Sequence, residues 1–388
     1  MNLILPMDSN RPTRAEVRLG ALYRNFDTLK SLSGPSKIMA VVKADAYGHG
    51  LLRTAEELAL LGADYLGVAL VEEAVFLRKN RIKTPILVLG PLATHQITEF
   101  ILNNIDVTVP SLEKAEAISA EAVRLERTAK IHIKIDTGMG RIGMQWNRTI
   151  LETVKRIIEL PNLGLRGVFS HFACADTDRE VTLRQLDRFN AIVDKCRGLA
   201  SKPFIAHIAN SAGLIQYPEA RLDMVRPGIA LYGYNPIEGH HLALEPVLRL
   251  MSRVAYFKAV EAGTALSYGH TYTTESDTRI ATIPVGYADG YSRCFSNKAS
   301  VIIRNRQYRV AGTVCMDQIL VDLGADGTAY NGDEVMLFGV KGSDSIPLET
   351  LCKIADTIPY ELLCRISSRV PRIRSEERRV GKECRSRV

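Results

Sequence analysis

The sequence predicts an α/β fold, in which an N-terminal (β/α)8 barrel of the TIM type precedes a C-terminal, mainly β domain. Between residue 37 and about residue 233, eight short apolar runs alternate with amphipathic stretches of helical length. After Pro236, apolar runs follow one another through turn-rich segments with little helix between them. Eight strands joined by helical crossovers favour a closed barrel over an open doubly wound sheet.

The eight predicted barrel strands are short apolar runs, each compatible with burial on both faces. They lie at residues 37–43, 64–69, 85–89, 106–110, 130–136, 164–171, 204–209 and 223–232. Helical patterns lie between them at residues 51–61, 70–79, 112–127, 150–160 and 181–199. The crossover from the seventh strand to the eighth is short and poorly patterned.

The second half predicts a separate β domain. Its apolar runs lie at residues 249–260, 279–285, 300–311, 318–323 and 334–340, and a late helix is predicted near 348–356. We therefore expect a barrel domain over residues 12–240 and a β domain over 241–373, with 15–19 as a strand of either one. Residues 374–388 have no apolar periodicity, which predicts a disordered or artefactual tail.

Composition indicates a cytoplasmic globular protein. Apolar residues make up 46% and charged residues 24% of the 388-residue chain, and no apolar run is long enough to span a membrane. The N-terminus has no basic segment and too short an apolar core for a signal peptide. Seven cysteines without any CxxC spacing argue for reduced thiols, against a disulfide framework and against a metal site.

The net charge of +7 does not indicate a nucleic-acid partner. Residues 374–388 hold six basic and three acidic residues and so supply +3 of that charge. The rest of the chain lacks a motif that combines basic and aromatic residues for nucleic-acid binding.

The segment Lys43-Ala44-Asp45-Ala46-Tyr47-Gly48-His49-Gly50 follows the first predicted strand. A lysine at a barrel strand's C-terminal end lies where this fold gathers its catalytic residues. Removed from water, such an amine has a lowered pKa and can form a Schiff base. The alternative is a strand-end lysine that extends its amine to solvent.

Other polar residues end the remaining strands at the same rim. Lys134 and Asp136 end the fifth strand, His171 the sixth, and Asn210 and Ser211 the seventh, while Arg226 to Ile229 lie in the eighth. The catalytic residues of a barrel come from several strand ends, so this distribution predicts one shared site.

Strand five alternates isoleucines with polar residues, so Lys134 is expected to point into the barrel. A buried charge is costly unless it is paired or chemically altered. Asp136 is a candidate ion-pair partner. Arg141, in the following glycine-rich loop, suits a carboxylate or a phenolate.

The last two strands offer hydroxyl and backbone N–H donors at Ser211, Gly228 and Ile229. The loops after strands seven and eight commonly bind phosphate in this fold. No GxxxxGK[ST] motif occurs, which favours a phosphorylated cofactor over a nucleoside triphosphate. Alternatively, Ser211 caps a helix.

In the β domain, Tyr268 and Tyr287 lie in glycine-flanked loops, and Met316 interrupts two apolar strands. A tyrosine acts as a general base only when a cationic neighbour lowers its pKa from about 10. The alternative for each tyrosine is packing at a wet edge.

Together these motifs resemble the alanine racemase family of pyridoxal-phosphate enzymes. The resemblance runs in order from about Arg14 to Arg372. It is carried by VVKADAYGHG, KIDTGMGRIG, SHFACAD, HIANSAG, MVRPGIALYG, SYGHTY, PVGYADGY, GTVCMDQ and IPYELLCRISSRVPR. It implies a homodimer that interconverts L- and D-alanine on pyridoxal 5'-phosphate and supplies D-alanine for peptidoglycan.

The resemblance assigns roles by motif. Lys43 is similar to the lysine that holds the cofactor as an internal aldimine and acts as one base. Tyr268 is similar to the second base, which the other subunit contributes. Arg226 would contact the pyridine nitrogen, with His171 between that arginine and the tyrosine. The positions implied to hold the phosphate are Tyr47, Ser211, Gly228, Ile229 and Tyr360.

Substrate contacts are implied in the same way. Arg141 would contact the phenolic oxygen and the substrate carboxylate, the Met316 backbone would bind that carboxylate, and Tyr287 would form part of the active-site entrance. Lys134 matches a position that is carbamylated in many members. Thr313 departs from the family at a position where many relatives carry an arginine, which leaves substrate access and selectivity open.

Two other functions are compatible with the same motifs. One is a serine-preferring or broad-specificity racemase of the same family. The other is a non-catalytic barrel that carries pyridoxal phosphate, although such a protein would lack the β domain and the Tyr268 loop.

Overall fold

The computed structural model describes residues 10–240 and 242–375. Most of the predicted 374–388 tail, and Cys384 with it, lies outside the described residues. The chain divides into two compact units. The barrel unit comprises Tyr23–Ala46 and Leu51–Glu245, and the β unit comprises Tyr47–Gly50 with the described parts of Met1–Leu22 and Pro246–Val388.

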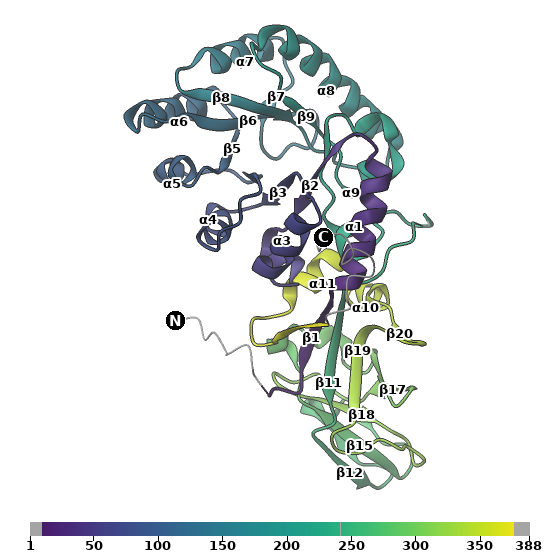
Figure 1. The fold of residues 1–388 in the computed structure, drawn as a ribbon. Helices are drawn as coiled ribbons and strands as arrows, with labels where there is room; N and C mark the ends of the chain where they lie inside the picture. Colours follow the sequence, from purple (N-terminus) through teal and green to yellow (C-terminus); the bar gives the residue numbers. More distant parts are fainter. Residues whose placement is uncertain (1–9, 241, 376–388) are drawn as a thin grey trace, which may run out of the picture. The chain divides into compact units, whose positions relative to one another are not determined.

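The barrel unit contains the eight parallel strands that the apolar runs predict (Figure 1). They are β2 (Lys37–Val41), β3 (Tyr65–Val68), β4 (Ile86–Val88), β5 (Asp106–Val109), β6 (Ala129–Asp136), β8 (Leu163–Phe169), β9 (Ile205–His207) and β10 (Met224–Val225). Their order is β10-β2-β3-β4-β5-β6-β8-β9, so chain neighbours are also sheet neighbours. The predicted fold class is confirmed.

The barrel is nearly closed between its last two strands. The N–H of Asp223 donates to the carbonyl of Ala206 (3.2 Å), and the N–H of Arg226 donates to the carbonyl of Ala209 (2.9 Å). Strand β10 is much shorter than the predicted run of 223–232, because Pro227 cannot donate to a ladder and Ile229–Tyr232 continue as a 3-10 helix.

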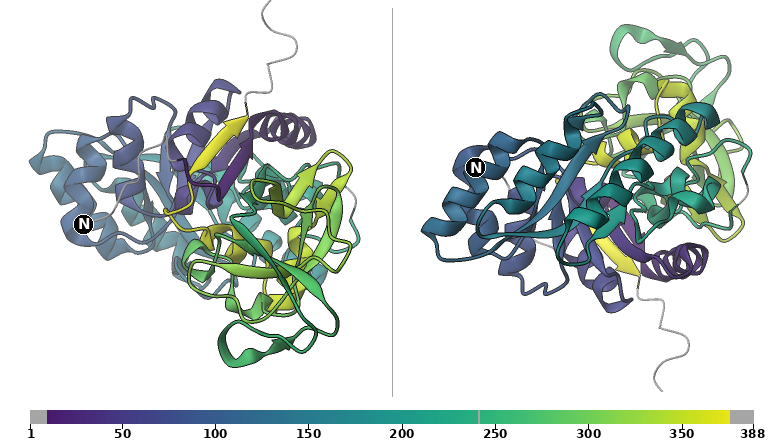
Figure 2. Two further views of the ribbon diagram at one scale, coloured as in Figure 1. Left: turned by 90° about the horizontal axis from the view of Figure 1, so that it is seen from below. Right: turned by 90° about the horizontal axis from the view of Figure 1, so that it is seen from above.

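Helices join consecutive strands, and Figures 1 and 2 show them around the outside of the barrel strands. They are α3 (Leu51–Leu60), α4 (Val71–Lys79), α5 (Ile97–Leu102), α6 (Leu112–Arg124), α7 (Ile150–Glu159), α8 (Arg179–Leu199) and α9 (Ser211–Gln216). Ser111 caps α6 by accepting the N–H of Lys114 (3.3 Å), and Asp178 caps α8 by accepting that of Val181 (3.0 Å). Helix α1 (Leu19–Ser33) precedes β2.

The interior of the barrel is not wholly apolar. Strands β3, β4 and β5 are buried along their whole length, as parallel strands covered by helices are. The enclosed polar residues include Asp106, His132, Lys134, His207 and Arg226, each at most 6% exposed. Because buried polar groups are generally hydrogen-bonded, we expect these side chains to take part in a network of hydrogen bonds inside the barrel.

The β unit is built on one mixed sheet with the order β12-β15-β18-β17-β16-β19-β11-β1-β21 (Figure 1). Its strands are β1 (Arg14–Arg18), β11 (Leu248–Arg253), β12 (Tyr256–Val260), β15 (Thr278–Ile283), β16 (Ser300–Ile303), β17 (Arg306–Val310), β18 (Ile319–Asp322), β19 (Glu334–Lys341) and β21 (Arg372–Ser375), with β20 (Asp344–Ile346) paired to β19. Strand β1 pairs with β11 and β21, so the segment near residue 15 belongs to this unit.

Two predicted long runs are each two strands. Arg304 and Asn305 have φ of 49° and 62°, so the run over 300–311 is the hairpin β16–β17 with a tight turn. The run over 249–260 divides between β11 and β12 at Val254 and Ala255. The late helix is present as α10 (Leu348–Ala355), and an unpredicted α11 (Pro359–Arg365) follows it.

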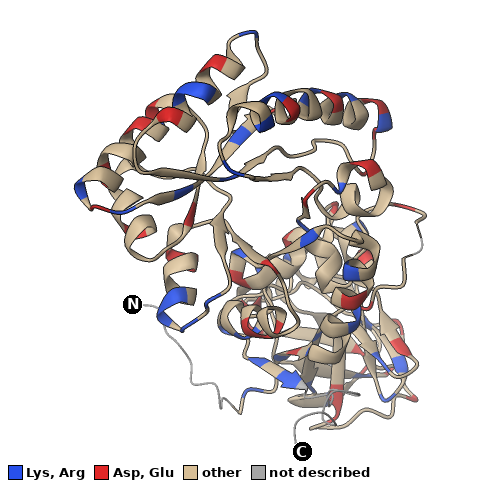
Figure 3. Ribbon diagram, turned by 45° about the horizontal axis from the view of Figure 1, so that its top comes forward, with Lys and Arg blue, Asp and Glu red and all other residues tan. Residues whose placement is uncertain are grey.

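Charged residues of both signs are interspersed along the barrel unit's helices (Figure 3). The six cysteines among the described residues are free thiols. No helix in the described part of the chain is long and apolar enough to cross a membrane. Within the same residues, His, Cys, Asp and Glu side chains form no cluster suited to a metal ion.

Candidate active site

Lys43 follows β2 closely and opens a turn with an unusual backbone. Ala44 and Asp45 have φ of 54°, and Ala46 and Tyr47 have φ of 53°. Left-handed conformations cost non-glycine residues on the order of 1 kcal/mol each, so four in succession need support from their surroundings. Strain of this kind is typical of functional sites, and here it lies beside the lysine that the sequence singles out.

Two carboxylates support this turn. Glu73, in the first turn of α4, accepts the N–H of Ala44 through Oε1 (2.7 Å) and backbone N–H groups at the start of α4 through Oε2. Asp45 Oδ1 accepts the N–H of Leu51 (2.7 Å), where α3 begins. The backbone next to Lys43 is therefore tied to the two helices that follow it.

A cavity of about 460 Å³ lies at the carboxyl ends of the barrel strands. Its polar lining comes from Lys43, Lys134, Arg141, His171 and Arg226. Ala69, Leu89, Gly90, Pro91, Met139, Ile142 and Phe169 complete the lining. None of the described residues that line it is a carboxylate, so the cavity suits an anionic, partly apolar ligand. The structure thus brings together five of the residues predicted from the sequence.

Lys134 enters the cavity from β6 and is 6% exposed. Burial lowers the pKa of its amine well below the usual value, and the charges of Arg226 and Arg141 lower it further. Its Nζ lies 4.2 Å from the centroid of the Phe169 ring. Both effects favour the neutral form of the amine, which is the nucleophilic form.

The predicted ion pair between Lys134 and Asp136 is not formed. Asp136 Oδ1 instead accepts the N–H groups of Gly138, Met139 and Gly140, at 2.9 to 3.1 Å. Asp136 therefore shapes the glycine-rich loop that carries Arg141. No carboxylate in the described chain lies within ion-pair distance of Lys134.

Arg226 is 3% exposed and donates in four directions. Its guanidinium bonds the carbonyls of Ser170 (2.7 Å) and Ile208 (3.0 Å) and the Nδ1 atoms of His207 (2.9 Å) and His171 (3.2 Å). Burial lowers the pKa of Arg226 to about 9, so it remains protonated near pH 7. Burial, and then the charge of Arg226, lowers the pKa of His171 well below 6.5 and keeps that imidazole neutral.

The predicted phosphate-binding residues are divided between the two units. In the barrel unit, Ser211 Oγ accepts the N–H groups of Gly228 (2.9 Å) and Ala230 (3.3 Å), which fixes the backbone around Ile229. The helix-cap alternative for Ser211 is wrong, because Asn210 caps α9.

In the β unit, the rings of Tyr47 and Tyr360 lie 6.1 Å apart. Burial, with smaller contributions from Tyr360 and Cys364, raises the pKa of Tyr47, so its hydroxyl stays protonated. A protonated phenol is a hydrogen-bond donor, which is the form that suits phosphate.

Tyr268 lies in a loop of the β unit and is 72% exposed. Thr313 holds this loop: its hydroxyl donates to the carbonyl of Tyr268 (2.8 Å), and its own carbonyl accepts from Ser267 Oγ (2.7 Å). Ser267 has a φ of 61°, a left-handed conformation that these bonds stabilise. Thr313 therefore holds the backbone of the Tyr268 loop in place.

The loops of Tyr287 and Met316 interlock in the same unit. The N–H of Tyr287 donates to the carbonyl of Cys315 (3.0 Å), and the N–H of Ala288 donates to that of Met316 (3.1 Å). Gly286 permits this approach, since a Cβ there would lie 2.2 Å from the Met316 carbonyl oxygen. Both Tyr287 (44%) and Met316 (53%) are exposed.

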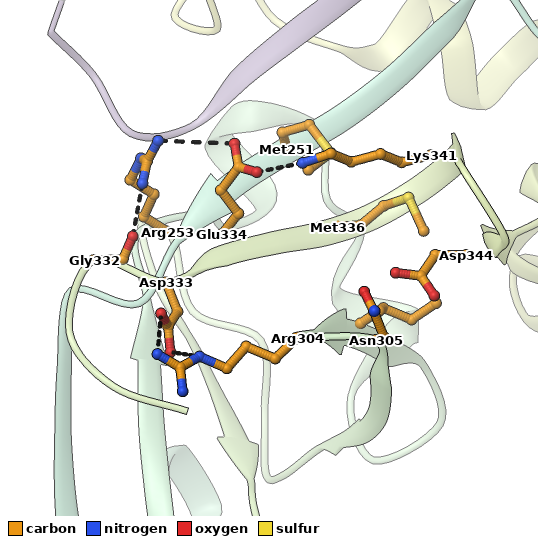
Figure 4. A pocket seen from close by; sticks show the side chains of 11 residues that line it. Met251, Arg253, Arg304, Asn305, Gly332, Asp333, Glu334, Met336, Lys341 and Asp344 are labelled. Carbon is orange, nitrogen blue, oxygen red and sulfur yellow. Dashed lines mark hydrogen bonds and ion pairs between the residues drawn. The ribbon is translucent and has the colours of Figure 1, made fainter. Parts of the chain in front are cut away.

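A second cavity, of about 590 Å³, lies in the β unit near β11 and β19 (Figure 4). Most of its charged groups form ion pairs: Arg304 pairs with Asp333 (2.8 Å), and Glu334 pairs with Lys341 and Arg253. None of the residues predicted for the site lines it, and beyond these pairs its described lining adds one carboxylate, Asp344, and no lysine or histidine. The chemistry therefore belongs to the barrel cavity.

Sequence reasoning missed two residues of the barrel site. The ring of Phe169 lies close to both Lys134 and Arg226, with centroid distances of 4.2 Å and 5.5 Å, but in the sequence it is one apolar residue of a strand. His207 is visible in the sequence as a histidine in a buried strand. Its hydrogen bond to Arg226 could not be predicted, because it depends on closure of the barrel.

Fold and site together define a class of protein: a barrel enzyme with an amine on its rim and a cationic cavity for an anionic ligand. Models of the alanine racemase N-terminal domain and C-terminal domain match residues 17–236 and 247–374. The chain belongs to the alanine racemase family, whose members are isomerases.

Relatives and solved structures agree with this membership. An alanine racemase of Symbiobacterium thermophilum is 44% identical over 95% of this chain and 98% of its own, and one of Halothermothrix orenii is 43% identical over 93% and 96%. The structure is similar to that of Clostridium difficile 630 alanine racemase, with a TM-score of 0.90 and 40% identity over 95% and 97% of the two chains. It is also similar to a Bacillus anthracis alanine racemase with bound L-Ala-P, with a TM-score of 0.87 and 35% identity over 96% and 97%.

Proposed function

We propose that this protein interconverts L-alanine and D-alanine in the cytoplasm, using pyridoxal 5'-phosphate, and so supplies D-alanine for peptidoglycan. The observation that carries the proposal is the barrel cavity, which combines Lys43 with Lys134, Arg141, His171 and Arg226 and no carboxylate. Membership of the alanine racemase family supports the same substrate.

The residues of the cavity fit the cofactor. An aldehyde needs an amine such as Lys43 for covalent attachment, and a phenolate needs a cation such as Arg141. When bound, the cofactor supplies an electron sink that makes the α-proton of an attached amino acid acidic. The apolar part of the lining, with Phe169 and Leu89, suits an aromatic ring.

Arg226 determines how strong that sink is. Its guanidinium keeps its proton near pH 7, so it can donate to a pyridine nitrogen but cannot accept from it. A ring nitrogen held by this donor would stay unprotonated, and the ring would be a weaker electron sink than a protonated pyridine. The substrate carbon would then be reprotonated quickly, which would limit side reactions.

Lys134 is proposed to become an anion by reaction with carbon dioxide. Its neutral amine attacks the carbon of CO₂, a C–N bond forms, and one proton leaves to solvent, giving a carbamate. Burial is the largest cause of the lowered pKa of this amine, and the charges of Arg226 and Arg141, which lower it further, would stabilise the new negative charge. The carbamate would then orient Arg141 toward the substrate carboxylate.

Racemisation requires one proton donor or acceptor on each face of the α-carbon. We assign one face to Lys43 and the other to Tyr268 of the partner subunit. In support, Tyr268 is 72% exposed and belongs to a different unit from the barrel cavity. The exposed backbone around Met316 and the ring of Tyr287 would reach the same site as substrate contacts and entrance.

Steady-state kinetics on the purified enzyme, with cofactor absorbance recorded, tests the proposal. We expect alanine to have a higher kcat/KM than serine, lysine or arginine, in both directions. Faster turnover of serine than of alanine would assign the chain to a serine-preferring enzyme. Cofactor absorbance with no racemisation of any amino acid would indicate a non-catalytic carrier.

A further inference from the structure

A continuous chain of hydrogen bonds crosses the barrel interior and ends at Arg226. Asp106 Oδ2 lies 3.2 Å from His132 Nε2, His132 Nδ1 lies 3.0 Å from His207 Nε2, and His207 Nδ1 lies 2.9 Å from Arg226 Nη1. The four residues come from β5, β6, β9 and the end of β10, and each is at most 3% exposed.

Along this series of hydrogen bonds, only one assignment of donors and acceptors is consistent. A guanidinium can only donate, so His207 Nδ1 must accept and the His207 proton must lie on Nε2. His132 Nδ1 must then accept from His207, which leaves the His132 proton on Nε2, facing Asp106. A carboxylate can only accept, so Asp106 completes the series without any unsatisfied atom.

Packing against neighbouring residues fixes the orientation of the two imidazole rings, and so preserves this assignment of donors and acceptors. The ring of His207 stacks on Phe169, with centroids 4.8 Å apart and planes within 3°. Gly167 leaves room for His132, since a Cβ at that glycine would lie 2.3 Å from His132 Nδ1. At the other end, the hydroxyl of Tyr65 also donates to Asp106 Oδ2 (3.3 Å).

Arg226 has no carboxylate partner in the part of the protein that the structure describes. In the described residues its partners are two carbonyls and two imidazole nitrogens, all of them neutral acceptors. Asp106 is the acceptor-only anion at the far end of the chain, and two neutral imidazoles connect it with the guanidinium. A hydrogen-bonded chain in a low-dielectric interior polarises each of its members in the same sense.

We propose that Asp106 is a positioning residue, which acts through His132 and His207 to hold Arg226 in one orientation as a donor toward the cavity. In this arrangement the carboxylate sets the tautomer of His132, that imidazole sets the tautomer of His207, and His207 Nδ1 receives the guanidinium. The kinetic consequence rests on the proposed racemase function, whereas the two tautomers do not.

The test combines imidazole NMR with kinetics on the holoenzyme. With ¹⁵N-histidine labelling, we expect His132 and His207 of the wild type to be protonated at Nε2 and unprotonated at Nδ1. Protonation of either ring at Nδ1 would overturn the proposal, even if no variant could be purified.

Asp106→Asn provides the matched perturbation, because an amide has nearly the same shape but can also donate. We expect the two imidazoles to lose their single tautomer and kcat for alanine to fall about tenfold or more, the range typical of outer-sphere partners, while KM changes less than about threefold. Asp223→Asn is the control. Asp223 accepts the N–H of Ala206, next to His207, but it is not part of the hydrogen-bond series from Asp106 to Arg226.

Each combination of results decides the matter. Unchanged tautomers in Asp106→Asn would show that the carboxylate does not set them. Altered tautomers with unchanged kcat would show that the chain does not position Arg226 for the reaction. If wild type fails to racemise alanine, the proposed function fails, and the tautomers still test the direction of the chain.

Discussion

At the scale of single residues, the site depends on Lys134 and Arg226, which form no ion pair with a carboxylate among the described residues. Lys134 and Arg226 both lie close to the Phe169 ring in the barrel cavity, and burial lowers the pKa of each. Placing charges of one sign together in a low-dielectric space is costly without a counter-charge. An anionic ligand, and an anionic form of Lys134, would each relieve that cost.

The Lys134 carbamate makes a direct prediction. Enzyme equilibrated with ¹³C-bicarbonate should show a carbamate carbon resonance that is missing in Lys134→Ala, because the neutral buried amine is the reactive one. Lys130→Ala, at the start of the same strand, is the matched control and should keep the signal. A wild-type spectrum without any carbamate resonance would contradict the assignment.

At the scale of elements, the loop of Tyr268 depends on Thr313, which in the sequence was notable only as a difference from the family that the motifs resemble. The Thr313 hydroxyl donates to the Tyr268 carbonyl and lies 3.3 Å from Thr271 Oγ1. A hydrogen bond of this kind contributes on the order of 1 kcal/mol. Thr313 therefore acts on Tyr268 through the backbone.

Thr313→Val should loosen this loop without disturbing the barrel cavity. We expect cofactor absorbance to be retained and kcat for alanine to fall by about fivefold, the factor that roughly 1 kcal/mol supplies. Thr273→Val, at an exposed position of β14 (Tyr272–Thr273), should change neither. An unchanged kcat in Thr313→Val would mean that the threonine does not position Tyr268.

The sequence predicted the eight barrel strands and the rim residues, because buried parallel strands are apolar runs and their polar ends stand out. It did not predict the left-handed turn at Ala44 to Tyr47, since alanine rarely adopts that conformation and Glu73, which stabilises it, lies on another helix. The run over 300–311 was predicted as one strand because Arg304-Asn305 is not a glycine turn. The series of hydrogen bonds from Asp106 to Arg226 could not be predicted either, because it joins residues that only the closed barrel brings together.

At the scale of the whole molecule, neutral buried histidines couple stability to pH. Burial lowers the pKa of His171 and His207 well below 6.5 in the folded state, whereas in the unfolded chain it is about 6.5. Below that pH the unfolded chain binds protons that the folded chain does not. The free energy of unfolding should therefore be unaffected by them above pH 6.5 and should decrease as the pH falls further.

Urea unfolding from about pH 7.5 down to 5.5 should measure this effect. Each such histidine contributes up to about 1.4 kcal/mol per pH unit below 6.5. His207→Gln removes one of them, so its stability should depend less steeply on pH than that of the wild type. Equal slopes for the two proteins would show that His207 is not kept neutral by the fold.

The proposed assembly divides each active site between two chains, with Lys43 from one subunit and Tyr268 from the other. A symmetric dimer then has two sites, each of which needs both residues intact. Neither Lys43→Ala nor Tyr268→Phe should racemise alanine as a pure homodimer, and Lys43→Ala should also lose the visible absorbance of the bound cofactor.

The most direct measurement is alanine racemisation after the two inactive variants are mixed, dissociated and allowed to reassociate. Random reassociation makes about half of the dimers mixed, and each mixed dimer contains one intact site, so activity should recover to about a quarter of the wild-type value. No recovery of activity, with mixed dimers demonstrated by mass, would contradict a site shared between subunits.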